Sequence, residues 1–239
     1  MDLSGKAAVV TGGTKGIGYA ISKSLAEAGA DVVLCARDEA TVAEVAKRLD
    51  EENRGSVLGV RCDMRRPESV EGLITSAVDR FDRLDILINN AGIGAFGPID
   101  ELSIETWHQV IETNLNGVFY ACHAAVPHMR RGGGGWIINI GSLAGKNPFA
   151  GGAAYNASKF GLLGFSEAMM LDVRQDDIRV SCIMPGSVAT HFSGPGSHGS
   201  TEWKLQPEDV AEMTLDLLSF SARALPSRVE MRPSKPPKR

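Results

Sequence analysis

A tyrosine and a lysine four residues apart, Tyr155 and Lys159, form the pattern in this sequence with the clearest chemical potential. In a helix this spacing puts both side chains on one face, where they can interact. A free tyrosine has a pKa of about 10, so it needs nearby positive charge to exchange a proton readily near neutral pH. The lysine can supply that charge. The plain alternative is a buried tyrosine and a solvated lysine on an amphipathic helix.

A serine upstream of this pair extends the chemistry. Ser142 follows the apolar run Trp136 to Ile140, which is typical of a buried strand. Its hydroxyl can hold a carbonyl oxygen while the tyrosine transfers a proton. Ser142, Tyr155 and Lys159 together therefore favour acid–base chemistry on a carbonyl or an alcohol over a purely structural role.

A glycine-rich turn near the N-terminus indicates a second kind of site. The segment Thr11-Gly12-Gly13-Thr14-Lys15-Gly16-Ile17-Gly18 follows the apolar run Ala7 to Val10 and opens into a helical pattern. Glycines permit tight backbone angles and close backbone approach, and free N–H groups at a helix start favour a pyrophosphate. A tight turn without any ligand is the alternative.

The elements that must position these residues alternate along the chain. Helical periodicity separates six apolar runs, namely 7–10, 32–34, 57–60, 86–88, 136–140 and 180–183, and the helical segments include 17–28, 41–49, 70–81 and 106–128. Alternating strands and helices imply crossover connections and a parallel sheet covered on both faces. We predict one doubly wound α/β domain over residues 1–239, with ligands at the carboxyl ends of its strands.

Four motifs in order resemble those of the short-chain dehydrogenase/reductase family, including its 3-oxoacyl-[acyl-carrier-protein] reductase-like members. They are the GxxxGxG spacing of the turn, Asn89-Asn90-Ala91-Gly92, Ser142, and Tyr155 with Lys159, and the resemblance spans roughly residues 3–190. It implies a Rossmann fold and hydride transfer between a nicotinamide cofactor and a carbonyl, with Tyr155 as the general acid/base. The catalytic set it implies is Asn114, Ser142, Tyr155 and Lys159.

Two members of this set receive further roles from the resemblance. Lys159 would also hold the cofactor ribose, and Asn114 would hold a water that links Lys159 to solvent. A buried amide that bends a helix is the alternative for Asn114. The resemblance also implies a cofactor-binding set: Gly12, Thr14, Lys15, Gly16, Ile17, Gly18, Arg37, Asp63, Met64, Asn90, Ala91, Gly92, Tyr155, Lys159, Pro185, Gly186, Val188 and Thr190. Within it Asp63 would bind the adenine, although a helix cap would also suit that residue.

The residue after the second strand favours NADPH/NADP+ over NADH. An acid there would bind a ribose 2′-OH, whereas a base would pair with a 2′-phosphate. The chain has Arg37 at this position, and Lys15 in the turn supplies a second cation. Asp38 argues for NADH, but its place before residues 39–49 suits a helix N-cap better.

An apolar set is expected to line the substrate pocket: Ile93, Phe96, Phe149, Phe192 and Trp203. A moderately hydrophobic carbonyl compound fits it, and the resemblance adds a 3-oxoacyl thioester as one candidate. Residues 193–203 suit a mobile lid or a plain loop, and 233–239 suit a solvated tail. From Arg228 the chain departs from the glycine-rich closing strand that relatives often carry.

Composition narrows the partners and the location. A net charge of −4 and a pI near 5.8 give no electrostatic reason to expect nucleic acid or an anionic membrane. The chain lacks a basic leader and any run near the roughly 18 apolar residues of a membrane span, so we expect a cytoplasmic protein. The cysteines at 35, 62, 122 and 182 have no ligand spacing, so we expect reduced core thiols and no metal.

The helix that carries Tyr155 continues through Phe160, Leu163 and Leu171 and is apolar on more than one face. Such a helix needs cover on its outer side, so we expect a homotetramer, with a dimer as the alternative. Two other functions use the same residues. An NAD(P)-linked dehydrogenase of a small or steroid-like alcohol would differ in cofactor and direction, and a dinucleotide-sensing protein would lack catalysis.

Overall fold

In the computed structural model, residues 1–190, 192 and 201–237 are described. Within that part of the chain a single parallel sheet has the strand order β3-β2-β1-β4-β5-β6-β7. Its strands are β1 (Ala7–Thr11), β2 (Asp31–Ala36), β3 (Val57–Arg61), β4 (Ile86–Asn89), β5 (Gly135–Ile140), β6 (Ile178–Pro185) and β7 (Arg228–Met231). The order reverses between β1 and β4, which places the ligand crevice beyond the carboxyl ends of these two strands.

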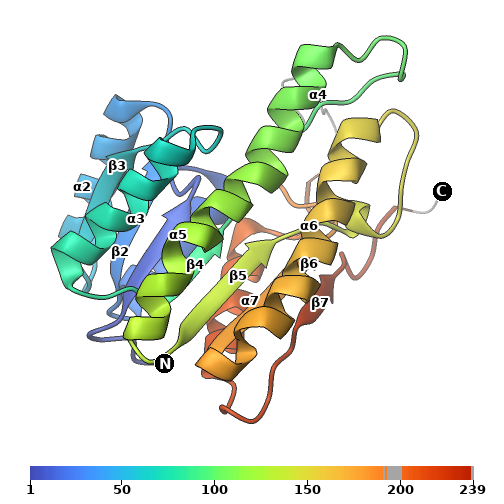
Figure 1. The fold of residues 1–239 in the computed structure, drawn as a ribbon. Coiled ribbons are helices and arrows are strands. Elements are labelled where there is room, and N and C mark those ends of the chain that lie inside the picture. The colour runs from blue at the N-terminus through green and yellow to red at the C-terminus, as the bar shows by residue number, and fades with distance from the viewer. Residues whose placement is uncertain (191, 193–200, 238–239) are drawn as a thin grey trace.

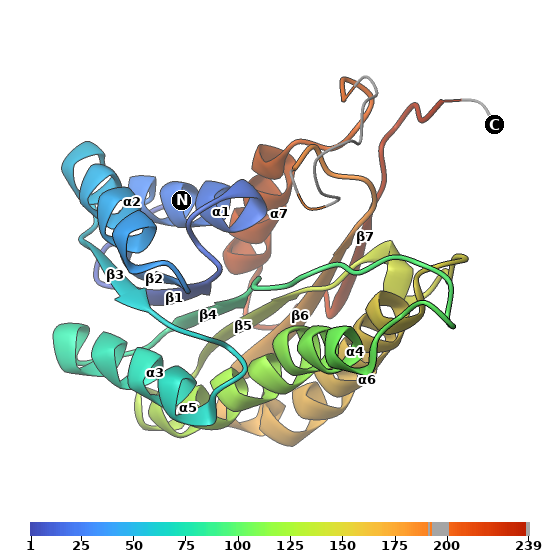
Figure 2. The same ribbon diagram turned by 90° about the horizontal axis from the view of Figure 1, so that it is seen from above.

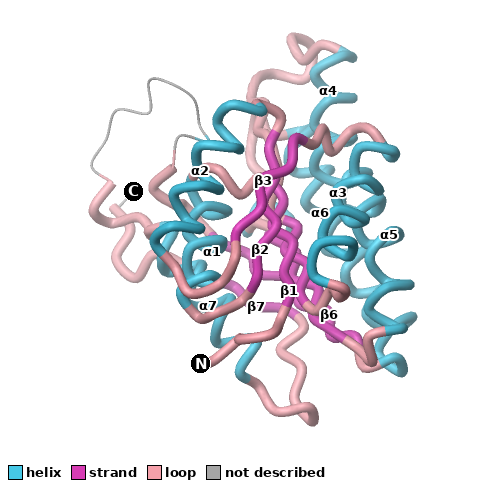
Figure 3. Tube along the Cα trace, turned by 90° about the vertical axis from the view of Figure 1, so that its left-hand side faces the viewer, coloured by secondary structure: helices cyan, strands magenta, loops and turns pink. Residues whose placement is uncertain are grey.

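Helices cover both faces of the sheet (Figure 1). One layer holds α1 (Gly16–Glu27), α2 (Glu39–Glu52) and α7 (Pro207–Ser219), and the other holds α3 (Pro67–Phe81), α4 (Ile104–Ile111), α5 (Gly117–Arg131) and α6 (Ala153–Val173). Figure 2 shows the first layer above the sheet and the second below it, and the edge-on view in Figure 3 separates the two layers clearly. The predicted doubly wound Rossmann fold is therefore confirmed.

Apolar clusters form between the sheet and these layers, including a small one that packs α2 against β2. Of the two larger clusters, one joins the sheet to α3, α5 and α6, and the other joins it to α1 and α7. The central strands are buried along their whole length, which explains why they appear in the sequence as unbroken apolar runs. All four cysteines are free and buried, as expected. Among the described residues, no helix is long and apolar enough to cross a membrane.

Two elements differ from the sequence-based expectation. The six apolar runs correspond to β1–β6. A further strand, β7, pairs in parallel with β6, and it begins at Arg228, where the sequence departs from the glycine-rich closing strand of many relatives. Its side chains alternate between exposed and half-buried, so it lacks the apolar run of an interior strand. The segment 106–128 is also not one regular helix, because the π-helical turn η1 (Glu112–Asn116) separates α4 from α5.

Candidate active site

The glycine turn lies between the end of β1 and the start of α1. Gly12 and Gly16 have φ angles of +65° and +54°, which side chains rarely allow. A Cβ at Gly18 would collide with the backbone oxygen of Gly12 and the side-chain nitrogen of Asn90. Lys15 precedes the helix and makes no side-chain cap, so the first N–H groups of α1 have no side-chain acceptor there. The turn therefore presents backbone donors, as the pyrophosphate prediction requires.

Asn90 and Thr11 fasten this turn to the end of β4. The Asn90 side-chain nitrogen donates to the carbonyl oxygens of Thr11 (2.9 Å) and Gly12 (3.1 Å). The Thr11 hydroxyl oxygen accepts from the backbone N–H groups of Asn90 and Ala91, both at 3.0 Å. Asn90 thus shapes the turn itself, a contribution that the motif alone did not disclose.

The remaining residues predicted around the turn differ in how far they are exposed to solvent. Lys15 is exposed, Thr14 and Ile17 are half-buried, and Ala91 and Gly92 continue from Asn90 as half-buried backbone. Met64 belongs to the apolar core. Thr190 lies against the turn, because a Cβ at Gly16 would come within 3.2 Å of its methyl group.

The loop after β6 is pinned on two sides. Strand β6 ends at Pro185, and the next residue, Gly186, donates its N–H to the carbonyl of Met231 at 2.8 Å. Val188 forms a bridge with Leu205. These bonds place Pro185, Gly186, Val188 and Thr190 at the carboxyl edge of the sheet. The predicted lid lies outside the described residues at 193–200.

A cleft of about 490 Å³ opens at the carboxyl ends of β2 and β3. Charged and polar side chains line it: Arg37, Arg61, Asp63, Arg66, Glu68 and Ser69. Arg37 is exposed, and Arg61 donates from Nε to its carbonyl oxygen at 3.3 Å. Sequence reasoning missed Arg61 and Arg66, although their positions after the third apolar run could have suggested them.

The two aspartates near this cleft have different roles. Asp38 caps α2, since its carboxylate accepts from the Thr41 N–H at 2.8 Å, as predicted. Asp63 does not cap α3, whose first residue Pro67 follows Arg66. It pairs instead with Arg65 at 2.7 Å, and the hydrogen bonds from that guanidinium lower the pKa of the Asp63 carboxyl.

Lys159 and Tyr155 meet on one face of α6, as their spacing predicts. The Lys159 ammonium donates to the carbonyl of Ile140 at 2.8 Å, and its nitrogen lies 5.8 Å from the centre of the Tyr155 ring. Burial lowers the pKa of Lys159 to about 8. The ammonium is therefore poised to titrate near neutral pH.

Burial and a neighbouring hydroxyl act on the pKa of Tyr155 in opposite directions. Burial raises the pKa of the Tyr155 hydroxyl, and a hydrogen bond with the Ser142 side chain offsets this only in part. Loss of solvation therefore outweighs this hydrogen bond, and the supply of positive charge by Lys159 stays a prediction.

Ser142 stands at the carboxyl end of β5. It begins the short 3₁₀ helix Leu143–Gly145, and its hydroxyl oxygen accepts from the Ala144 N–H at 3.1 Å. This bond and its contact with Tyr155 fix the hydroxyl at the edge where ligands of such sheets bind.

Asn114 is fully buried in the π-helical turn. Its amide oxygen accepts from the Ile93 N–H at 2.8 Å, and its nitrogen donates to the Ile93 carbonyl at 2.9 Å and to the Ser158 hydroxyl at 3.0 Å. Ser158 in turn donates to the carbonyl of Tyr155 at 2.8 Å. Asn114 therefore ties the loop after β4 to the helix that carries Tyr155 and Lys159.

Tyr155 belongs to an aromatic cluster, which it forms with Phe96, Phe149 and Phe192. The ring centres of Phe96 and Phe192 lie 5.7 and 5.5 Å from that of Tyr155, and Phe149 lies 5.9 Å from Phe96. Three predicted pocket residues thus gather at the tyrosine. Trp203 has its ring contact with Lys204 on its own segment instead.

Comparison with known proteins agrees with this geometry. Residues 6–199 match the family model for short chain dehydrogenases. An uncharacterized oxidoreductase of Staphylococcus saprophyticus is 34% identical over 98% of this chain and 99% of its own. A 3-oxoacyl-[acyl-carrier-protein] reductase of Chlamydia muridarum is 32% identical, with 95% of each chain covered.

A solved structure of a metagenomic short-chain oxidoreductase in complex with NADP superposes with a TM-score of 0.85. It shares 36% identity, and the match covers 98% of this chain and 99% of that one. The chain therefore belongs to the short-chain dehydrogenase/reductase family, whose members are oxidoreductases that use a nicotinamide dinucleotide.

Proposed function

We propose that the protein reduces a ketone or aldehyde to an alcohol with NADPH. The observation that supports this best is the grouping of Ser142, Tyr155 and Lys159 at the carboxyl edge of the sheet, with Lys159 buried against the tyrosine ring. A buried lysine without a chemical role would be costly, because it loses hydration and regains a single carbonyl contact.

The residues present fit a dinucleotide. Side chains are excluded from the turn at Gly18, and Thr190 and Asn90 border it on either side. In this proposal the glycine turn receives the pyrophosphate, the cleft beside Arg37 and Asp63 receives the adenosine end, and Lys159 holds the nicotinamide ribose. NADPH, when bound, supplies the hydride.

Each catalytic side chain then has a defined task. The Ser142 hydroxyl hydrogen-bonds the substrate oxygen, and Tyr155 donates its proton to that oxygen as the carbonyl carbon is reduced. Lys159 stabilises the tyrosinate that remains, with its ammonium charged below a pKa of about 8. Asn114 holds the loop after β4 against α6, and it lies beside the route by which solvent returns a proton to Tyr155.

Two observations favour NADPH over NADH. Arg37 is exposed in the cleft and Lys15 is exposed in the turn, so a 2′-phosphate between them would meet two cations. The metagenomic relative was solved with NADP. Asp38, the residue that would argue for NADH, is occupied as the cap of α2.

The decisive experiment follows NADPH oxidation against a panel of ketones and aldehydes, with Tyr155→Phe as the test variant. We expect turnover to fall by about 10²–10⁴-fold, the usual contribution of a general acid, while the variant still binds NADPH as measured by fluorescence. Wild-type turnover in the variant would refute the role of Tyr155.

A second candidate substrate is a 3-oxoacyl thioester, which the name of the Chlamydia muridarum relative supports. An acetoacetyl thioester therefore belongs in the same panel. It requires no change in the assigned roles, because the reacting group is again a ketone.

The proposed assembly is a homotetramer. Large apolar side chains on the outer face of α5 and α6 support it, with Phe119, Phe160 and Leu171 between 45% and 55% exposed. Sedimentation at micromolar concentration tests this assembly, and a monomer would contradict it.

A further inference from the structure

We propose that the aromatic cluster selects neutral aryl ketones and aryl aldehydes as substrates, in preference to aliphatic carbonyl compounds and to anionic thioesters. This inference rests on the proposed reductase function and names the substrate class of the same site. It depends on the ring geometry around Tyr155, the exposure of these rings and the charges on the loops that carry them.

The rings are arranged to receive another ring. Phe96 meets Tyr155 edge to face, with planes at 71°, while Phe149 and Phe192 are tilted at 43° and 56° to their neighbours. Inclined rings with centres 5.5 to 5.9 Å apart offer both faces and edges to an incoming arene. Such contacts add binding energy beyond the burial of apolar area.

Backbone contacts hold the cluster in place without a ligand. Gly97 on the loop after β4 donates to the carbonyl of Gly151 on the loop after β5 at 2.9 Å, and Figure 2 shows these loops side by side. A Cβ at Gly94 would lie 2.8 Å from the rings of Phe96 and Phe192, so the glycine lets both rings pack closely against this loop. The two phenylalanine-bearing loops therefore form a preorganised wall.

These rings are unusually exposed for their size. Phe96, Phe149 and Phe192 are 50%, 48% and 40% exposed, although they stand beside a tyrosine that is half-buried. Clustered exposed aromatic side chains at a reactive hydroxyl indicate a surface that a ligand covers.

The charges at this entrance disfavour anions. Residues 93–107 contain Asp100, Glu101 and Glu105 but no lysine or arginine. Lys146 on the other loop is paired with Glu230 at 2.7 Å. The acidic side chains of this loop would repel the phosphate groups of a thioester, whereas a neutral arene would not be repelled.

The reaction balances as a two-electron reduction. The hydride of NADPH forms a C–H bond at the carbonyl carbon, the C=O π bond breaks, and the oxygen takes the Tyr155 proton. The products are a benzylic alcohol and NADP+. Solvent returns the proton to the tyrosine.

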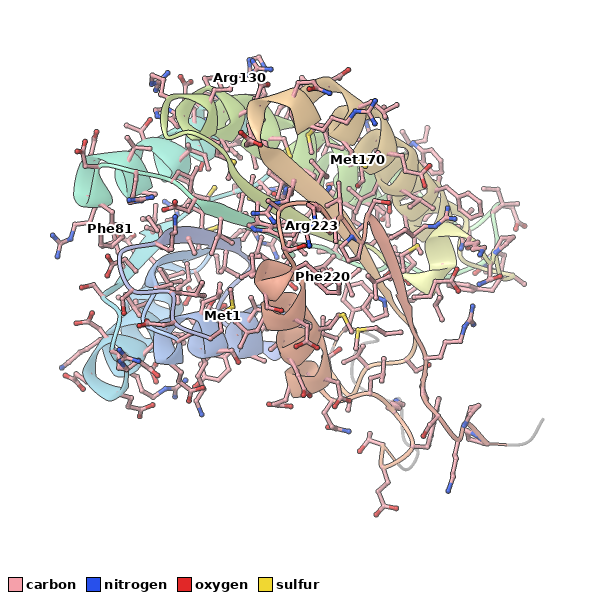
Figure 4. All side chains as sticks on the ribbon, turned by 90° about the horizontal axis from the view of Figure 1, so that it is seen from below. Met1, Phe81, Arg130, Met170, Phe220 and Arg223 are labelled. Carbon is pink, nitrogen blue, oxygen red and sulfur yellow. The ribbon has the colours of Figure 1, made fainter. Side chains whose placement is uncertain are left out.

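The test compares acetophenone with its saturated counterpart, cyclohexyl methyl ketone, and with acetoacetyl-coenzyme A. The variants are Phe96→Leu and Phe149→Leu, which keep apolar bulk but remove the ring. Phe220→Leu is the matched control, since Phe220 is 43% exposed and lies at the far end of α7 (Figure 4).

We expect wild type to favour acetophenone in kcat/KM. The acetophenone to cyclohexyl methyl ketone ratio should fall about 2–10-fold in each ring variant and stay constant in Phe220→Leu. An unchanged ratio in both ring variants, or a wild-type preference for the thioester, overturns the proposal.

Failure of the underlying reductase function gives a different result. In that case no carbonyl compound oxidises NADPH, although the cofactor still binds. Calorimetric titration of acetophenone into protein with NADP+ then decides the inference alone. Binding weakened by Phe96→Leu or Phe149→Leu supports it, and no binding or equal binding in all proteins overturns it.

Discussion

The Lys159 ammonium is held by the backbone carbonyl of Ile140, at 2.8 Å, inside a site that strips it of water. Burial lowers its pKa from 10.5 to about 8. The folded protein therefore binds fewer protons than the unfolded chain between these two values, and its stability must rise with pH across that window. The charged lysine thus lowers stability at neutral pH, which suggests that it is kept for function.

This relationship predicts a pH-dependent difference between wild type and Lys159→Met. From about pH 7.5 to about pH 9.5, the free energy of unfolding of wild type should rise by about 2 kcal/mol relative to the variant. Tyr155, whose pKa is raised by burial, is present in both proteins, so its own titration largely cancels in the difference between them. Urea unfolding at both pH values measures the difference, and parallel curves would contradict a depressed lysine pKa.

The glycine turn predicts a steric effect at Gly18. A methyl group there meets the Gly12 carbonyl oxygen and the Asn90 amide, neither of which can move without opening the turn. Gly18→Ala should cost about 1–3 kcal/mol of stability and weaken NADPH binding at least about tenfold. Fluorescence titration and thermal unfolding measure the two effects.

Gly72 in α3 supplies the matched control. It is an exposed helical glycine, and a methyl group added there would have no neighbouring atom within 4 Å. Gly72→Ala should therefore stabilise by about 0.4–1 kcal/mol, through the unfolded chain, and leave NADPH binding unchanged. Equal binding in both variants would show that the turn does not hold the cofactor.

The sequence discloses the fold wherever burial is complete. The runs that form β1, β2 and β4 are buried and almost wholly apolar because helices cover both sides of the sheet, whereas β3 at the sheet edge is only half-buried. Strand β7 escapes notice, since Arg228 and Glu230 interrupt its apolar pattern at the sheet edge. The π-helical turn is equally hidden, because helical periodicity continues through it.

The sequence predicts which residues form the site, but it does not predict their hydrogen-bond partners. The motifs indicate Asn90 and Asn114, yet their hydrogen bonds to Gly12 and Ile93 depend on how distant loops meet. The raised pKa of Tyr155 is likewise a property of burial, which spacing alone does not reveal. Local pattern thus identifies chemical groups, and tertiary packing determines their electrostatics.

Replacing Asn114 should lower the stability of the protein, because its side-chain hydrogen bonds are lost. Asn114→Ala leaves the Ile93 N–H without its side-chain acceptor and removes the donor to Ser158. We expect a loss of about 1–3 kcal/mol in the free energy of unfolding, and reduced kcat because Tyr155 loses part of its support.

Asn147→Ala is the comparison for this variant. Asn147 is exposed, follows the 3₁₀ helix Leu143–Gly145, and makes one long side-chain bond of 3.3 Å to the Leu143 carbonyl. Its loss should cost under about 0.5 kcal/mol. Chemical denaturation of the two variants separates the buried network from a general effect of removing an asparagine; equal losses would argue against the network.

If positive charge determines the preference for NADPH over NADH, removing that charge should reduce the preference. Arg37 and Lys15 are both exposed, and neither lies within ion-pair distance of a carboxylate among the described residues. Replacing both with serine should raise the KM for NADPH about 10–100-fold more than the KM for NADH, since charge-assisted hydrogen bonds to the phosphate are lost. Steady-state kinetics with each cofactor measures the ratio.

Lys23→Ser controls for the loss of surface charge, because Lys23 lies on α1 but pairs with Glu27 away from the turn. It should leave the ratio of the two KM values unchanged. Salt gives an independent check, as the wild-type preference for NADPH should weaken with rising ionic strength while that of the double variant should not. If the ratio survives the double substitution, the selectivity must reside elsewhere, and Arg61 or Arg66 in the same cleft become the residues to replace.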